Sequence, residues 1–165
     1  KEIEIHESFM KIVIDLAIER NNKYATIIVS PEGSVLCSGV DSTKDNPILR
    51  SELLAITNCS ASYSMSTFED HSIYSTSEPD PLAASSIVWA KFKTAVWGSS
   101  INDLYCRACI PHLPVESSFI FSKAFGVGTK KPIEQISGIL KDKTDQLFNS
   151  ECSNGIIKPQ CKCIN

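Results

Sequence analysis

The stretch Asn46-Pro-Ile-Leu-Arg-Ser-Glu52-Leu-Leu-Ala-Ile56 has the features of a helix start. Asn46 is a preferred N-cap residue, and Pro47 suits the first helical position because its missing N–H has no partner there in any case. Apolar residues then recur at helical spacing, among them Leu49 and Leu53. We therefore expect a helix that starts at Asn46 and runs to about residue 63.

The stretch Tyr74-Ser-Thr-Ser-Glu-Pro-Asp-Pro-Leu-Ala83 repeats this arrangement, with Asp80 as the cap and Pro81 after it. It predicts a helix over residues 82–92. A short β-branched and aromatic run before it predicts a strand over residues 71–76.

The sequence around these stretches alternates between helical and strand patterns. We expect a first helix over residues 6–20, a β-hairpin of strands 24–29 and 35–39, and a strand over residues 93–97. This order predicts an α/β structure with helices packed on a central sheet. Beyond residue 101 we expect short helices at 102–109 and 117–125. A last amphipathic helix is expected through Ile133, Ile136, Leu140 and Leu147.

Composition narrows the functional classes. The chain has 165 residues and a mass of 18.1 kDa, which favours one domain. Its ordinary composition argues against disorder, collagen and a coiled coil, and a net charge of -3 argues against general electrostatic binding of nucleic acid. No apolar run approaches about eighteen residues, so no membrane span is expected.

Seven cysteines are many for a cytosolic chain of this size and favour an oxidising compartment. We therefore expect a secreted or periplasmic protein, with the cytoplasm as the alternative. The start at Lys1 fits removal of a signal peptide, and fits a trimmed expression sequence equally. Cys37 and Cys59 are interpreted as small buried hydrophobic residues. At least one disulfide is expected to join Cys106 or Cys109 to the C-terminal cysteines or to link these to one another: Cys152, Cys161 and Cys163.

The two quoted stretches resemble the zinc-dependent cytidine/deoxycytidylate deaminase-like family, and most closely its guanine deaminases and tRNA adenosine deaminases. That family carries His-x-Glu on one helix and Pro-Cys-x-x-Cys at the start of another. The frame of both motifs is kept here at Pro47, Glu52, Thr76, Glu78, Pro79, Pro81, Trp89 and Ala90.

The resemblance implies a three-layer α/β/α fold with a mixed central sheet of about five strands. It implies a deaminase-like domain over residues 1–148, followed by a cysteine-bearing tail over residues 149–165. Because such proteins commonly pair, it also implies a homodimer.

The resemblance places Arg50 at the histidine ligand position, and Asp80 and Ala83 at the two cysteine ligand positions. All three zinc ligands are therefore lost, and no zinc or other cofactor is expected. Zinc generates the hydroxide that attacks the ring carbon, so deaminase activity is not expected either. Glu52 is left as the remnant of the proton shuttle.

The resemblance also assigns Asp41 and Trp89 to the substrate pocket. Asp41 replaces the asparagine that binds the base, and Asn22-Lys-Tyr-Ala25 replaces a glycine-containing stretch of guanine deaminases. We expect Arg50 to form an ion pair with Asp80 and Glu52 where the metal would lie. The alternative is that Arg50 points to solvent and water fills the space.

Two hypotheses of function follow. The first is a catalytically inactive homologue that binds a small nucleobase-like ligand or a protein partner. The second is an active deaminase or another hydrolase with a rebuilt site, in which Glu52 and Asp80 act as acid and base.

Three further motifs have mainly structural interpretations. Cys106-Arg-Ala-Cys109 with His112 has the spacing of a zinc or redox motif, but a disulfide to the tail is favoured. Gly126-Val-Gly128-Thr-Lys130-Lys131 lacks the context of a phosphate loop and is interpreted as a solvated loop. Asn58-Cys-Ser60 is a glycosylation sequon, interpreted as incidental because it falls in an expected helix near the core.

Overall fold

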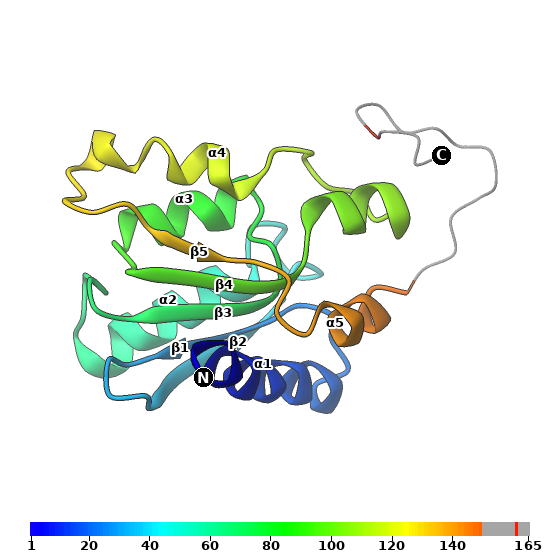
Figure 1. Cartoon of the computed structure of the whole chain (residues 1–165), viewed down its shortest axis with the longest axis horizontal. Helices are drawn as coiled ribbons and strands as arrows, with labels where there is room; N and C mark the ends of the chain where they lie inside the picture. Colours follow the sequence, from blue (N-terminus) through cyan, green and yellow to red (C-terminus); the bar gives the residue numbers. More distant parts are fainter. Residues whose placement is uncertain (150–160, 162–165) are drawn as a thin grey trace.

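The computed structural model describes residues 1–149 and residue 161, and its centre is a five-stranded mixed sheet in the order β2-β1-β3-β4-β5 (Figure 1). β1 (Ala25–Val29) pairs antiparallel with β2 (Val35–Val40) and with β3 (Ser72–Ser77). β4 (Thr94–Ser99) runs parallel to β3, and β5 (Glu134–Ile136) runs parallel to β4. The expected mixed sheet of about five strands is confirmed.

Helices cover both faces of this sheet, which confirms the three-layer fold (Figure 1). α1 (Glu2–Glu19) and α5 (Lys141–Leu147) lie on one face. α2 (Ser51–Tyr63) and α3 (Pro81–Trp89) lie on the other, with α4 (Ser117–Phe121) packed against α3. Two short helical turns complete the described elements, a π-helical turn at Asp103–Arg107 and a 3-10 turn at Ala124–Val127.

α2 begins at Ser51, so the prediction of a start at Asn46 was wrong. Oδ1 of Asn46 accepts the Ile48 N–H at 3.2 Å, and the Asn46 carbonyl accepts the Leu49 N–H at 3.0 Å. The asparagine therefore stabilises a turn that precedes the helix. Arg50, extended at φ −71° and ψ 154°, is the actual N-cap. The start of α3 after Asp80 is confirmed.

The expected amphipathic helix through Ile133 and Leu147 is also wrong. Its first part is the strand β5, and α5 begins only at Lys141. Gly138 and Leu140 have φ values of +74° and +51°, in the left-handed region that a helix interior excludes. The apolar spacing arises because Ile136 and Leu140 pack against the core under α1 from a strand and a turn.

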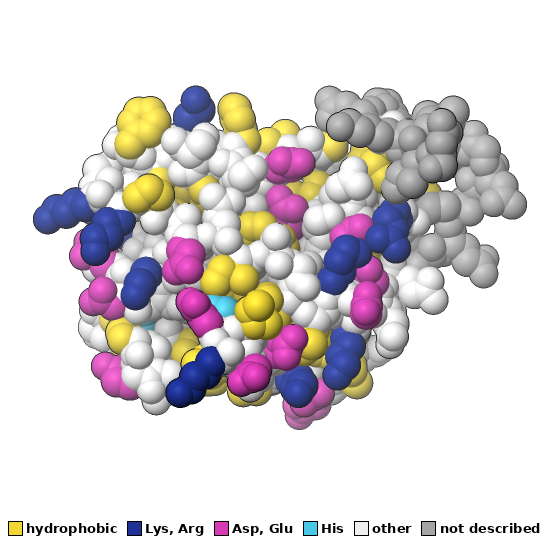
Figure 2. All heavy atoms as spheres, viewed as in Figure 1, with side chains coloured by type: hydrophobic (Ala, Val, Ile, Leu, Met, Phe, Trp, Pro, Cys, Tyr) yellow, Lys and Arg dark blue, Asp and Glu magenta, His cyan; other side chains and the backbone are white. Residues whose placement is uncertain are grey.

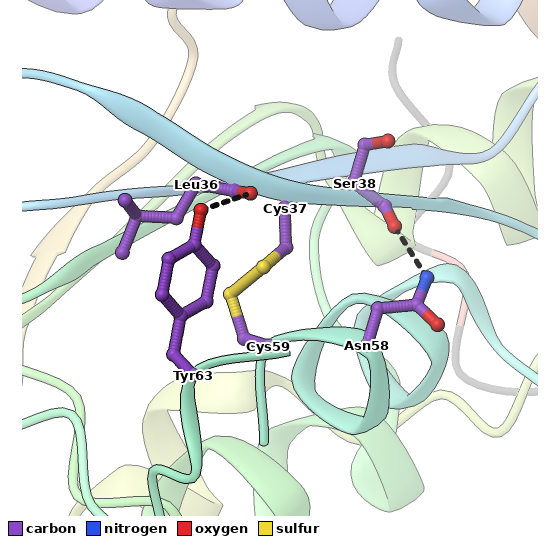
Figure 3. Close-up of a disulfide and its surroundings, with 6 residues drawn as sticks. All are labelled: Leu36, Cys37, Ser38, Asn58, Cys59 and Tyr63. Atoms are coloured by element: carbon purple, nitrogen blue, oxygen red, sulfur yellow. Dashed lines mark hydrogen bonds between the residues drawn. A yellow bond between two sulfur atoms is a disulfide. The ribbon is translucent and has the colours of Figure 1, made fainter. Parts of the chain in front are cut away.

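Two disulfides are formed between described cysteines. Cys37 on β2 is bonded to Cys59 on α2 (Figure 3), so the interpretation of both as free buried thiols was wrong. A half-cystine in a core has the same apolar sequence neighbours as a free thiol, which explains the error. Cys106 is bonded to Cys161, which confirms the expected link to the tail. Outside the described residues lie the other tail positions, Cys152 and Cys163.

Lys and Arg side chains are interspersed with Asp and Glu on the face shown in Figure 2, in keeping with the small net charge. Across the residues that the structure describes, no helix combines the length and the apolar character needed to cross a bilayer.

Candidate functional site

The N-termini of α2 and α3 meet beside the end of β3, and three of the expected positions come together there. Arg50 caps α2 and Asp80 caps α3. Nε of Arg50 lies 3.0 Å from Oδ2 of Asp80, while Oδ1 of Asp80 accepts the backbone N–H of Ala83 at 2.8 Å. One carboxylate therefore caps α3 and also balances the guanidinium at the start of the neighbouring helix.

The expected ion pair between Arg50 and Asp80 is thus confirmed. The Arg50 side chain is 38% exposed and that of Asp80 is 11% exposed. Nε of Arg50 is buried and its N–H is not directed at an acceptor, so the contact is electrostatic rather than an aligned hydrogen bond. The expected second contact to Glu52 is not formed, since Asp80 is the carboxylate in salt-bridge contact with Arg50 among the described residues.

Glu52 is buried at the first turn of α2, with 5% of its surface exposed. Its Oε2 accepts the hydroxyl of Ser51 at 3.2 Å, and that hydroxyl belongs to a buried chain with Thr26 (2.8 Å) and Ser75 (2.9 Å from Thr26). The pKa of Glu52 is raised to about 7, chiefly by burial and also by the nearby carboxylates of Asp41 and Asp80, against hydrogen bonds that lower it.

Asp41 holds the start of α2 from the loop after β2. Its Oδ1 accepts the Ser51 N–H at 2.7 Å, one of the amides that a helix start leaves without a partner. Burial raises the pKa of Asp41 to about 6, against the effects of this hydrogen bond and of Arg50. Gly39 allows the close approach of α2, because a Cβ there would lie 2.5 Å from the Ser51 carbonyl oxygen.

An aromatic group completes the site on the side of β1. The hydroxyl of Tyr24 lies 3.2 Å from Nε2 of His112, and its ring lies 5.1 Å from that of Phe148. Burial, followed by the charge of Asp41, raises the pKa of Tyr24. The sequence did not identify these three residues as one group. The only signal was the replacement of the family's stretch at Asn22-Lys-Tyr-Ala25.

Two expectations of site residues are corrected. Trp89 is the last residue of α3, at the opposite end from Asp80, and its side chain is 70% exposed, so it does not join the group. The proposed zinc or redox motif is not formed either, because Cys106 is in a disulfide and His112 contacts Tyr24.

Glu78, a residue of the family frame, has a structural role. Its carboxylate accepts the N–H of Ile101 at 3.1 Å, and the N–H and hydroxyl of Ser117 at 2.7 and 3.0 Å. It therefore joins the loop after β3 to the loop after β4 and to the start of α4, and it fixes the position from which α3 begins.

A family model gives the decisive comparison. The cytidine and deoxycytidylate deaminase zinc-binding region matches residues 3–99, which carry Arg50, Glu52 and Asp80. The chain belongs to this deaminase family. A search of curated proteins found no matching relative.

Solved structures of deaminases share the fold. Guanine deaminase from Nitrosomonas europaea has a TM-score of 0.69 at 15% identity, with 86% of this chain and 81% of that chain covered. A tRNA deaminase studied for A-to-I editing at the wobble position has a TM-score of 0.60 at 15% identity, covering 82% and 93%. A diaminohydroxyphosphoribosylaminopyrimidine deaminase/reductase from Thermotoga maritima has a TM-score of 0.66 at 20% identity, covering 89% and 40%.

The donor set at the site does not fit the zinc ion that the family name implies. The guanidinium of Arg50 is permanently protonated, and the methyl group of Ala83 has no donor atom. Asp80 is the one remaining donor, and both of its oxygens have partners. A catalytic zinc needs three protein ligands. In residues 1–149 and 161, no three or more His, Cys, Asp or Glu side chains are grouped to hold a metal.

Proposed function

We propose that this deaminase-family protein has no deaminase activity and acts by binding. The ion pair of Arg50 and Asp80 carries the proposal, because it places a fixed cation at the positions that the resemblance assigns to the zinc ligands. A guanidinium neutralises a carboxylate as a metal does, but it does not generate hydroxide at neutral pH. The ion pair thereby keeps the fold but does not supply the hydroxide that the family's reaction needs.

The ligand class follows from the groups around this ion pair. The half-buried ring of Tyr24 is packed against the buried ring of Phe148 and offers an aromatic face, and Asp41 and Glu52 offer carboxyl groups that accept N–H donors. This combination suits a planar molecule with several N–H groups, so a nucleobase-like ligand is the proposed class.

An active hydrolase with a rebuilt site is the second candidate, and Glu52 favours it. A carboxyl group with a pKa of about 7 is well matched to proton transfer at neutral pH. Asp80 would have to be its partner, yet both oxygens of Asp80 are engaged by Arg50 and Ala83.

Ammonia release separates the two candidates. The purified chain is incubated with guanine, cytidine and adenosine, and Glu52→Gln is the matched control. We expect no release above that of the control. Turnover that Glu52→Gln abolishes would overturn the proposal and establish the hydrolase. Thermal shift with the same compounds tests binding, and we expect a base to raise the melting temperature of the unmodified chain.

The compartment and the assembly state belong to the same proposal. The disulfides of Cys37 with Cys59 and of Cys106 with Cys161 support an oxidising compartment. A homodimer is proposed from the resemblance alone, and light scattering coupled to size exclusion tests it.

A further inference from the structure

Side chains from α2 cover the free edge of β2. β2 is the outermost of the described strands, so one of its edges has no partner among them. Nδ2 of Asn58 donates to the Ser38 carbonyl at 2.9 Å, and the hydroxyl of Tyr63 donates to the Leu36 carbonyl at 3.5 Å (Figure 3). The Cys37–Cys59 disulfide joins the same strand and helix between these two contacts.

Asn58 is an exposed residue at this edge. It is followed by Cys59 and Ser60, which complete the only Asn-x-Ser/Thr sequence in the chain. Its position in a helix is as the sequence predicts, but the expectation that it lies near the core is wrong. We propose that Asn58 carries an N-linked glycan, a modification confined to accessible asparagines of secreted chains.

The transfer uses one of the two N–H bonds of the Asn58 amide. Nδ2 of Asn58 forms a bond to the anomeric carbon of an oligosaccharide, and the bond from that carbon to a lipid diphosphate breaks. The lipid diphosphate leaves with the electron pair, and one of the two Nδ2 protons passes to a base of the transferase. The other N–H stays on Nδ2, so Asn58 keeps one donor within reach of the Ser38 carbonyl.

The disulfides support this modification independently of the sequon, because the ER lumen, one of the compartments in which disulfides form, is also where such glycans are added. The position gives the glycan a physical role. Exposed edge strands pair with other chains unless they are covered or charged. A glycan on Asn58 would lie against the one edge of β2 that already depends on side chains for cover.

The test is made on the full chain, secreted from eukaryotic cells behind a cleavable leader. Its mass is measured before and after peptide N-glycosidase, which removes the glycan and converts the modified asparagine to aspartate. We expect a mass loss for the wild type and for Ser60→Thr, and none for Ser60→Ala. Ser60→Ala keeps Asn58 and its bond to Ser38, so its result does not depend on a folding defect.

Asn58→Gln should likewise show no mass loss. A secreted wild type whose mass the enzyme leaves unchanged would overturn the proposal. So would an enzyme-sensitive glycan that persists in Ser60→Ala.

Discussion

The Asp80 carboxylate has two partners, and they can be separated by mutation. Arg50→Met removes the charge but keeps much of the stem, and Asp80→Asn keeps an oxygen for the Ala83 N–H. We expect each to lower the free energy of unfolding by about 1 kcal/mol, because the pair is partly exposed. The double variant should lose little more than either single variant, because both changes remove the same interaction. Asp80→Ala should cost about 1 kcal/mol beyond Asp80→Asn, since it also removes the cap. Urea denaturation measures all four, and fully additive losses would show that the pair contributes nothing.

Glu52 should make the stability depend on pH. Because burial raises its pKa from 4.5 to about 7, the folded state keeps a proton that the unfolded state releases. The contribution of this proton to the free energy of unfolding is therefore fully present below pH 4.5. It is lost as the pH rises to about 7, which lowers the free energy of unfolding by roughly 3 kcal/mol. Glu52→Gln has no such loss, so its stability relative to the wild type should rise by roughly 2 to 3 kcal/mol between pH 5 and pH 8. Denaturation at both pH values checks this. If the difference in free energy of unfolding between Glu52→Gln and the wild type is the same at both, Glu52 is solvated rather than buried.

Site residues could be predicted from the sequence only where a motif aligns the chain with the family. Arg50, Asp80 and Glu52 were identified because they stand at defined positions of a family frame, and the charges of Arg50 and Asp80 predicted their pairing. Tyr24 and His112 belong to no motif and are brought together by the tertiary fold from distant parts of the chain. The predicted contact of Arg50 with Glu52 is not formed because the Glu52 carboxylate accepts a hydrogen bond from the buried hydroxyl of Ser51 instead.

At the scale of elements, the start of α2 depends on Asp41, a residue of the loop that follows β2. Asp41→Ala should leave the Ser51 N–H without its acceptor and lower the free energy of unfolding by about 1 kcal/mol. Asp41→Asn keeps an oxygen and should lose less. Hydrogen exchange of the Ser51 amide should speed up in Asp41→Ala alone. Equal exchange in both variants would mean that Asp41 does not cap the helix.

Most strands and helices could be predicted because their patterns are local, as in the hairpin of β1 and β2 and the cap of α3 at Asp80. The start of α2 could not, because Asn46 suits a turn as well as a cap and the acceptor for the Ser51 N–H comes from Asp41, outside the local helix pattern. β5 could not either, since its three residues are a strand only through pairing with β4.

At the scale of the whole molecule, the Cys37–Cys59 bond closes a ring that contains Asp41, Arg50 and Glu52. The double variant Cys37→Ala/Cys59→Ala should lower the free energy of unfolding by about 3 kcal/mol, as expected for a loop of 22 residues. Denaturation without reductant measures the loss. A change below about 0.5 kcal/mol would show that the ring is already held by its noncovalent contacts.

Zinc content tests the central claim, that an ion pair has replaced the metal at the meeting point of two helix N-termini. The wild type and the triple variant Arg50→His/Asp80→Cys/Ala83→Cys are purified without added metal, and each is then equilibrated with zinc and desalted. Elemental analysis should find stoichiometric zinc in the triple variant, because its side chains restore a full ligand set, and only traces in the wild type. Stoichiometric zinc in the wild type that Asp80→Asn removes would contradict the account.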